Sequence, residues 1–341
     1  QWTESTPASA RFRSLSKSIP MRFLRYLPAR FLPTSRPRQP CGSGRAVRLL
    51  ATPLDCRIES EMTYQLDTLL PSEFSRWLLL RAVGVNLATL PRWIPPEDQQ
   101  ELYAAATSYD DPHAYLAPTH PRLLAYHALH DVSQMLIDNP LIVPNTFACT
   151  GIVSLPAYSA PADGHLLLGR DFDFEGGESF GRQKSLTYVI PPPGQGIPYA
   201  HVAWPGLEGC VTGMNKERIA LFINAAATSD FRRIGTPTIL MAREILENAR
   251  SLDDAERIIR HTQVFVSDIV VVAHGKTGQA RVFEKSPGAT AAYDVDASLA
   301  VTNHLISPTF AADPVERRRI TDSTAMQRYQ RARQLLDQMK Q

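Results

Sequence analysis

Residues 146–155, TFACTGIVSL, stand where the pattern of the chain changes, and this change decides the fold class. On the C-terminal side of Cys149, short runs of β-branched and other apolar residues alternate with turn residues, which is typical of strands. The polar pair Asp163-Gly164 predicts a turn that folds the second run back on the first. The predicted strands span 150–155, 165–174, 186–190, 201–204, 219–224, 269–273, 280–284 and 299–304.

Two consecutive helices interrupt these predicted strands, at 237–249 and 252–261. Ser251 precedes the second helix, and acidic residues occupy its first turn, which is typical of a helix N-terminus. Strands, then two helices, then strands again predict two antiparallel sheets with helices packed outside them. We therefore expect an α+β fold with αββα layering.

Residues 49–148 differ from the rest because their pattern is mainly helical. The helices predicted there span 59–70, 96–109 and 123–137, the first two with acids in the opening turn and the third with apolar side chains largely on one face. Pro140 and Pro144 end the third helix and predict an extended, exposed approach to Cys149.

Composition separates a basic N-terminal stretch from the rest of the chain, and it argues against a nucleic-acid-binding or transmembrane protein. Of 341 residues, 44% are hydrophobic and 21% charged, as in globular proteins. Residues 1–48 hold nine Arg and one Lys against one acid, and we expect a disordered leader; lipid binding or targeting is the alternative. The remainder carries 26 basic and 33 acidic residues, which argues against nucleic-acid binding. The chain contains no run of 18 apolar residues, so no transmembrane segment is predicted.

These features predict three regions: a leader at 1–48, a helical N-terminal segment at 49–148 and a catalytic domain at 149–341. The chain ends inside a helix-like run, so the catalytic domain is expected to be truncated at its C-terminus. A cytoplasmic or membrane-peripheral location is favoured over secretion, and the oligomeric state is left open.

Cys149 is the strongest candidate for chemistry. The four cysteines lack the spacing of a disulfide framework or a zinc ribbon. If the chain is cut after Ala148, the new α-amino group of Cys149, with an ordinary pKa of about 7.7–8, can serve as the base for its own thiol. Arg170 would supply a positive charge that favours thiolate, and Asp173 would hold the new amino group. The alternative is a buried core cysteine at the edge of a strand.

Five motifs occur in one order: CT at 149–150, GRDFDF at 169–174, GMNKERIALFIN at 213–224, TNH at 302–304 and RYQR at 328–331. This set resembles the acyl-coenzyme A:6-aminopenicillanic acid acyltransferase family of cysteine Ntn hydrolases. It is more distantly similar to the choloylglycine and penicillin V hydrolases. The resemblance implies the Ntn-hydrolase αββα sandwich and autocatalytic cleavage before the nucleophile. It also implies further strands that close the sheets beyond the end of this chain, so the catalytic domain is expected to be truncated or to lack these strands.

The resemblance also implies roles for individual residues. Cys149 corresponds to the nucleophile, Arg170 to the arginine beside it, and Asp173 to the aspartate that binds the new amino terminus. Asn303 corresponds to the oxyanion donor. Asn224 aligns with the residue that completes the oxyanion hole in some members, and Arg328 with a later arginine of the hydrolase branch. Most members carry Asn where Asp171 stands.

These inferences predict an autoprocessed enzyme that hydrolyses or exchanges the acyl group of a small amide through a thioester. Its partners would be an acyl amide or acyl thioester substrate and its own cleaved N-terminal fragment. The alternative is a catalytically silent relative that binds a ligand or partner in the same cleft. A metal-dependent hydrolase or a metal-binding helical region is a third hypothesis, which rests on His113, His120, His127 and His130. His127 and Asp131 lie four residues apart on one helix face, but no HExxH pattern supports this hypothesis. We expect no cofactor and no metal.

Overall fold

The computed structural model describes residues 72, 84, 87–108, 111, 118–137, 148–159, 164–173, 184–204 and 207–338. The predicted leader at 1–48, the predicted helix at 59–70, and Pro140 and Pro144 lie outside these residues. Within the described ranges, no helix combines the length and the apolar character that crossing a bilayer requires.

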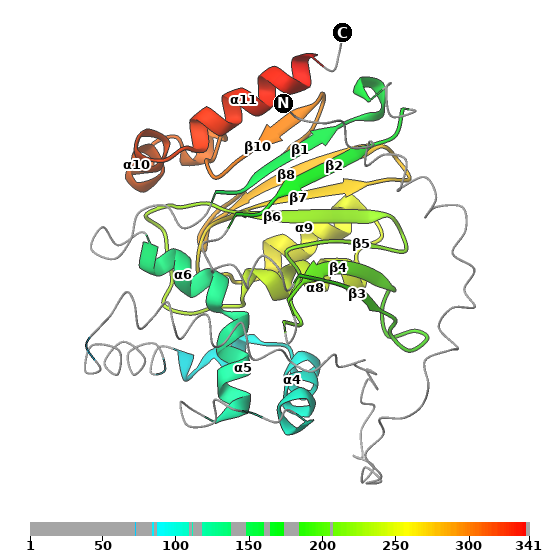
Figure 1. Ribbon diagram of the computed structural model, residues 1–341, viewed down its shortest axis with the longest axis vertical. Helices are drawn as coiled ribbons and strands as arrows, with labels where there is room; N and C mark the ends of the chain where they lie inside the picture. Colours follow the sequence, from blue (N-terminus) through cyan, green and yellow to red (C-terminus); the bar gives the residue numbers. More distant parts are fainter. Residues whose placement is uncertain are drawn as a thin grey trace, which may run out of the picture. The chain divides into compact units, whose positions relative to one another are not determined.

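The larger sheet has seven antiparallel strands in the order β3-β4-β5-β6-β7-β8-β9 (Figure 1). Their bounds are β3 Ser185–Val189, β4 Tyr199–Ala203, β5 Thr212–Asn215, β6 Ile219–Ala225, β7 Asp268–His274, β8 Gln279–Lys285 and β9 Thr290–Asp294. Strands adjacent in sequence are adjacent in the sheet. All seven residues of β7 are buried, as its Val-rich sequence requires. The core of the protein therefore lies on both faces of this strand.

The smaller sheet has the order β10-β1-β2, with β1 Thr150–Ser154 in the centre, β2 Leu167–Asp171 and β10 Leu299–Val301. Gly151 of β1 lies opposite Arg170 of β2 and Val301 of β10. The short helix η3, Pro156–Tyr158, lies in the connection from β1 to β2, where Gly164 has a φ of 68°. The predicted return of the second strand along the first is confirmed.

The two sheets pack face to face, and helices cover their outer faces (Figure 1). Val153 of the smaller sheet shares a core cluster with Phe222 and Val271 of the larger sheet. Helices α8, Thr238–Asn248, and α9, Leu252–His261, pack on the other face of the larger sheet. Helix α11, Ala325–Gln338, packs on β1 and β10, after η5, Pro308–Phe310, and α10, Pro314–Asp322. This confirms the predicted αββα layering.

The N-terminal part contributes η2, Leu90–Trp93, and helices α4, Pro96–Ser108, α5, Thr119–His127, and α6, Leu129–Ile137. The prediction of one continuous helix over 123–137 is wrong, because the chain breaks at Ala128. Ala128 is fully buried in the core, and the preceding His127 accepts a hydrogen bond from the backbone N–H of Glu208. Tertiary packing, rather than Gly or Pro, therefore sets this break.

A buried arginine joins helix α4 to helix α8. Arg243 of α8 forms ion pairs with Glu101 of α4 at 2.5 Å and with Glu247 at 3.0 Å. Glu208 lies 3.5 Å from the same guanidinium. Burial, together with the neighbouring Glu101, raises the pKa of Glu208 to about 8. The helical segment is thus attached through a buried network with more acids than bases.

Candidate active site

Cys149 lies immediately before β1 and is fully buried, with a free thiol. The backbone N–H of Ala148 donates to the carbonyl oxygen of Asp173 at 3.2 Å, so the predicted cleavage site lies beside the end of β2. Gly151 allows a close approach, because a Cβ there would lie 2.3 Å from the ring of Phe222. β1 and β6 are therefore in close contact next to Cys149.

Arg170 reaches from β2 to the thiol of Cys149. Its Nη2 lies 3.6 Å from Sγ and also donates to the backbone oxygen of Ile223. Its Nε donates to Asn224 Oδ1 and its Nη1 to Thr212 Oγ1, both at 3.2 Å. Burial lowers the pKa of Arg170, while the nearby Cys149 opposes this shift. The guanidinium is thus held beside the sulfur atom by three oxygen acceptors.

Arg328 contacts Cys149 from helix α11. Its Nη1 donates to the backbone oxygen of Cys149 and to Thr150 Oγ1, the latter at 3.1 Å. Its Nη2 donates to Asn303 Oδ1 at 2.8 Å. Burial lowers the pKa of Arg328, and the charges of Cys149 and Asp173 oppose this shift. Helix α11 is therefore connected to the candidate nucleophile by hydrogen bonds.

The two asparagines differ in how their amides are used. Asn303 is buried and donates from Nδ2 to the backbone oxygen of Ala225 at 2.9 Å, which uses one of its two amide hydrogens. Asn224 donates from Nδ2 to the backbone oxygens of Val301 at 3.3 Å and Thr302 at 3.1 Å. Because Asn224 Oδ1 also accepts from Arg170, its amide joins β6 to β10 and positions the guanidinium.

Asp173 contributes its backbone to this arrangement, while its side chain is exposed. Partial burial first, and then the neighbouring Asp171, raise the pKa of the Asp173 carboxyl, while Arg328 and Lys184 oppose this shift. Five of the six residues predicted for the site are thus linked by hydrogen bonds: Cys149, Arg170, Asn224, Asn303 and Arg328. Asp173 lies beside them through its hydrogen bond to Ala148.

Several residues of the site were not assigned a role from the sequence. Thr212 accepts from Arg170, and the hydroxyl of Thr150 accepts from Arg328. Buried Glu284 accepts from the backbone N–H groups of Ile306 at 2.7 Å and Ser307 at 3.0 Å, which fixes the loop after Asn303. An acid within the apolar strand 280–284 is the one feature that could have indicated this role.

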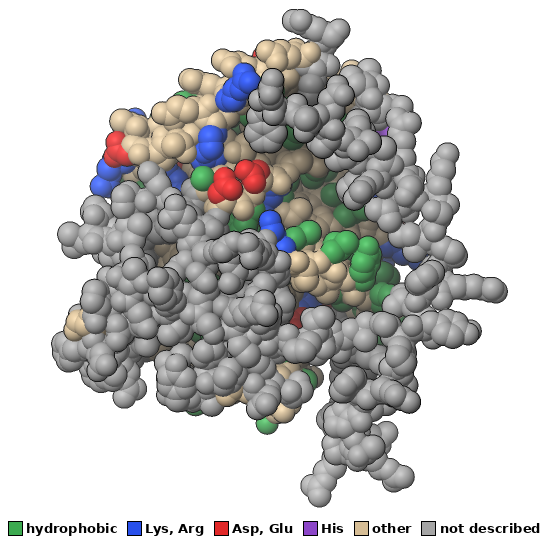
Figure 2. Space-filling model, in the orientation of Figure 1, with side chains coloured by type: hydrophobic (Ala, Val, Ile, Leu, Met, Phe, Trp, Pro, Cys, Tyr) green, Lys and Arg blue, Asp and Glu red, His purple; other side chains and the backbone are tan. Residues whose placement is uncertain are grey.

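A cavity of about 690 Å³ lies beside the site, where α11 covers the smaller sheet. Its polar lining includes Thr150, Arg170, Asp171 and Arg328, and its apolar lining includes Ile152. Figure 2 shows Lys and Arg side chains in the region of α11, with Asp and Glu side chains close by. The cavity thus combines positive charge with an apolar wall.

Residues 160–341, slightly more than half of the chain, match the family described as acyl-coenzyme A:6-aminopenicillanic acid acyl-transferase. The chain belongs to this family. The predicted resemblance is therefore confirmed, and the Ntn-hydrolase αββα sandwich is the fold of this acyl-transferase family member.

Individual similarities are more distant. An uncharacterized protein of Archaeoglobus fulgidus is 28% identical over 131 residues, which cover 38% of this chain and 21% of that protein. The N-acylethanolamine-hydrolyzing acid amidase ortholog of Caenorhabditis elegans matches with 19% identity and a TM-score of 0.38, over 56% of this chain and 85% of that one. A mutant conjugated bile acid hydrolase of Clostridium perfringens matches with 13% identity and a TM-score of 0.34, over 47% and 54%.

Proposed function

We propose that the protein is a cysteine Ntn amidohydrolase or acyltransferase that cuts its own chain between Ala148 and Cys149. The observation that carries the proposal is the double contact with Cys149: Arg170 faces its sulfur and Arg328 binds its carbonyl oxygen. Membership of the acyl-transferase family supports the reaction class. Substrates are small molecules with an acyl amide or acyl thioester group.

Self-cleavage begins with attack of Cys149 Sγ on the carbonyl carbon of Ala148. A C–S bond forms, the amide C–N bond breaks, and the proton lost by the thiol goes to the leaving nitrogen. Water then hydrolyses the thioester, which gives a carboxyl group on Ala148 and restores the thiol. The attack is intramolecular, because the thiol and the peptide bond that it attacks belong to adjacent residues.

Turnover uses the same groups after cleavage. The freed α-amino group of Cys149 takes the thiol proton, and the sulfur accepts the acyl group of the substrate. The second amide hydrogen of Asn303 stabilises the oxyanion, while Arg328 holds Asn303 through its carbonyl oxygen. Asn224 keeps Arg170 directed at the sulfur. Water releases the acyl group in hydrolysis, and an acceptor amine releases it in transfer.

The cleaved N-terminal fragment remains bound. Helix α4 would belong to this fragment, and its Glu101 is paired with buried Arg243 of the other fragment. Leu102 of the same helix is fully buried in the core cluster that contains Leu240 and Met241 of α8. Separation would expose this apolar surface and leave buried charges without partners, both of which are unfavourable.

Intact-mass analysis and N-terminal sequencing of purified protein test the proposal. We expect a fragment that begins at Cys149 in the unmodified chain and none in Cys149→Ala. Cys210→Ala is the matched control, because Cys210 is equally buried and burial raises the pKa of its thiol to about 12. The same cut in Cys149→Ala would assign it to an external protease. Uncut protein without amidase activity would favour a silent, ligand-binding relative.

A further inference from the structure

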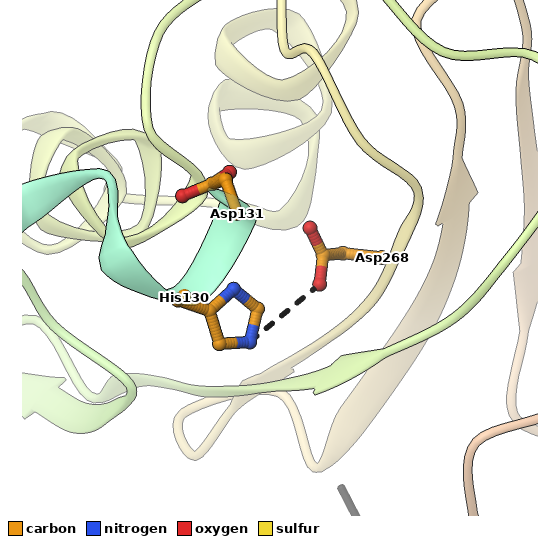
Figure 3. Close-up of side chains that lie close together, drawn as sticks. All are labelled: His130, Asp131 and Asp268. Atoms are coloured by element: carbon orange, nitrogen blue, oxygen red, sulfur yellow. Dashed lines mark ion pairs between the residues drawn. The ribbon is translucent and has the colours of Figure 1, made fainter. Parts of the chain in front are cut away.

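Three buried side chains near the start of β7, in the larger sheet, have no part in the chemistry described above. His130 and Asp131 lie on α6, and Asp268 is the first residue of β7 (Figure 3). One possible ligand atom from each residue lies within 4.8 Å of the others. His130 Nε2 and Asp268 Oδ1 are 3.9 Å apart, and the imidazole ring lies beside the Asp268 carboxylate in Figure 3.

The hydrogen bonds of the described residues do not satisfy this cluster. Asp131 Oδ1 accepts from the backbone N–H of Thr238 at 3.1 Å, but Asp131 Oδ2, fully buried, has no hydrogen-bond partner among them. The Thr238 hydroxyl lies 3.0 Å from Asp131 Oδ1 and 2.7 Å from Asp268 Oδ2. Since a hydroxyl carries one hydrogen, it cannot donate to both carboxylates at once. Among the described residues, the donors that face the two carboxylates therefore leave one carboxylate oxygen open to a further cation or proton.

The charges agree with this conclusion. Within the described ranges, no Lys or Arg forms an ion pair with Asp131 or Asp268, although both carboxylates are buried.

We propose that His130, Asp131 and Asp268 bind one divalent transition-metal ion, of which Zn²⁺ and Mn²⁺ are the best matches. One imidazole nitrogen and two carboxylate oxygens are a donor set that both ions accept. Ligand atoms about 2.1 Å from a tetrahedral ion lie about 3.4 Å apart, so the separations of 3.9 Å between His130 and Asp268 and of up to 4.8 Å within the cluster would shorten when an ion binds. Gln134 supports this arrangement, because its Nε2 donates to Asp268 Oδ1 at 2.9 Å.

The ion would connect two segments on opposite sides of Cys149. Helix α6 precedes the candidate cleavage site, whereas β7 follows it. A metal held by both would therefore stabilise the association of these segments, whether or not the chain is cut. The inference does not depend on the proposed catalytic function, since no ligand belongs to the site around Cys149.

Metal analysis of the full-length protein tests the inference. After chelator treatment and addition of Zn²⁺ or Mn²⁺, we expect about one ion per chain by plasma mass spectrometry and a higher melting temperature. Co²⁺ should give the visible absorption of a bound, low-symmetry site. Asp268→Asn and Asp131→Asn keep the shape of each side chain but should abolish stoichiometric uptake. The matched control is His127→Gln, because both ring nitrogens of buried His127 already have partners in Leu123 and Glu208.

Two results would overturn the inference. Absence of stoichiometric uptake of all three ions would leave Asp131 and Asp268 as a pair that shares a proton through Thr238. Uptake that persists in Asp268→Asn and Asp131→Asn would place the ion elsewhere in the chain.

Discussion

Addition of a single methyl group at Gly151 tests whether the spacing between the two sheets controls the reactivity of Cys149. A Cβ at this position would lie 2.3 Å from Cζ and 2.4 Å from Cε2 of Phe222. Ordinary carbon contacts are about 3.5–4.0 Å, so the strand or the ring must move by about 1 Å. Overpacking of this kind costs about 1–3 kcal/mol of folding free energy.

The same displacement would alter the 3.6 Å contact between Arg170 and Cys149 Sγ. A shift of about 1 Å can reduce a reaction rate by about 10²-fold. We therefore expect Gly151→Ala to slow the appearance of the fragment that begins at Cys149 by up to about this factor, and to lower the urea midpoint. Quantitative mass spectrometry and urea unfolding measure the two effects.

Two further variants make the test specific. Gly169→Ala adds the same methyl group on β2, where it meets only the flexible side chain of Ile152 at 3.0 and 3.3 Å, and it should have a much smaller effect. The double variant Gly151→Ala with Phe222→Leu should recover part of the cleavage rate, because it removes the clashing ring atoms. Cleavage and stability unchanged in Gly151→Ala would show that the spacing does not control the site.

Three other predictions concern turnover and stability. Asn303→Ala should lower the chemical step by about 10²–10³-fold with little change in KM, and a change in KM alone would make it a substrate contact. Asp173→Asn should move the ascending limb of the pH–rate profile to lower pH, because a carboxylate favours the charged form of the α-amine; Asp171→Asn is the control and should be tolerated. For Glu208, whose folded-state pKa is about 8, the folded chain retains a proton that the unfolded chain loses near pH ~4.5. Stability should therefore fall as pH rises from ~4.5 to ~8, and a pH dependence unchanged in Glu208→Gln would refute this assignment.

The order of elements could be predicted from the sequence because local signals were strong. The helix at 252–261 has the same bounds in the structure, and Ser251 accepts the capping hydrogen bond from the backbone N–H of Asp254 at 3.1 Å. Two strands were missed. Thr212–Asn215 contains Gly and Asn, and Thr290–Asp294 contains two alanines, and these residues disfavour strands when considered alone. Both become strands because neighbouring strands supply hydrogen-bond partners.

The sequence indicated candidate residues for the site, but it did not indicate the hydrogen bonds that connect them. Motif order indicated Cys149, Arg170 and Asn303, and the structure brings them into one hydrogen-bonded network. Nothing in the sequence indicates that Thr212 accepts from Arg170, because the two residues lie on different sheets. Asn215 belongs to one of the motifs but is not part of the hydrogen-bonded network around Cys149. Its side chain donates instead to the backbone oxygens of Leu246 and Ala249, at the C-terminus of α8. Only the packing of the sheets distinguishes these roles.

The contact between Arg328 and the carbonyl oxygen of Cys149 joins residues 179 positions apart in the chain. The ribosome makes Cys149 long before it makes helix α11, so a nascent chain has the thiol but lacks one of its two arginine contacts. Formation of such a distant contact is slow compared with local helix formation. The self-cleavage proposed above would therefore begin only when the last described helix has docked on β1. The time at which the cut fragment appears would then report when folding of the described part of the chain is complete.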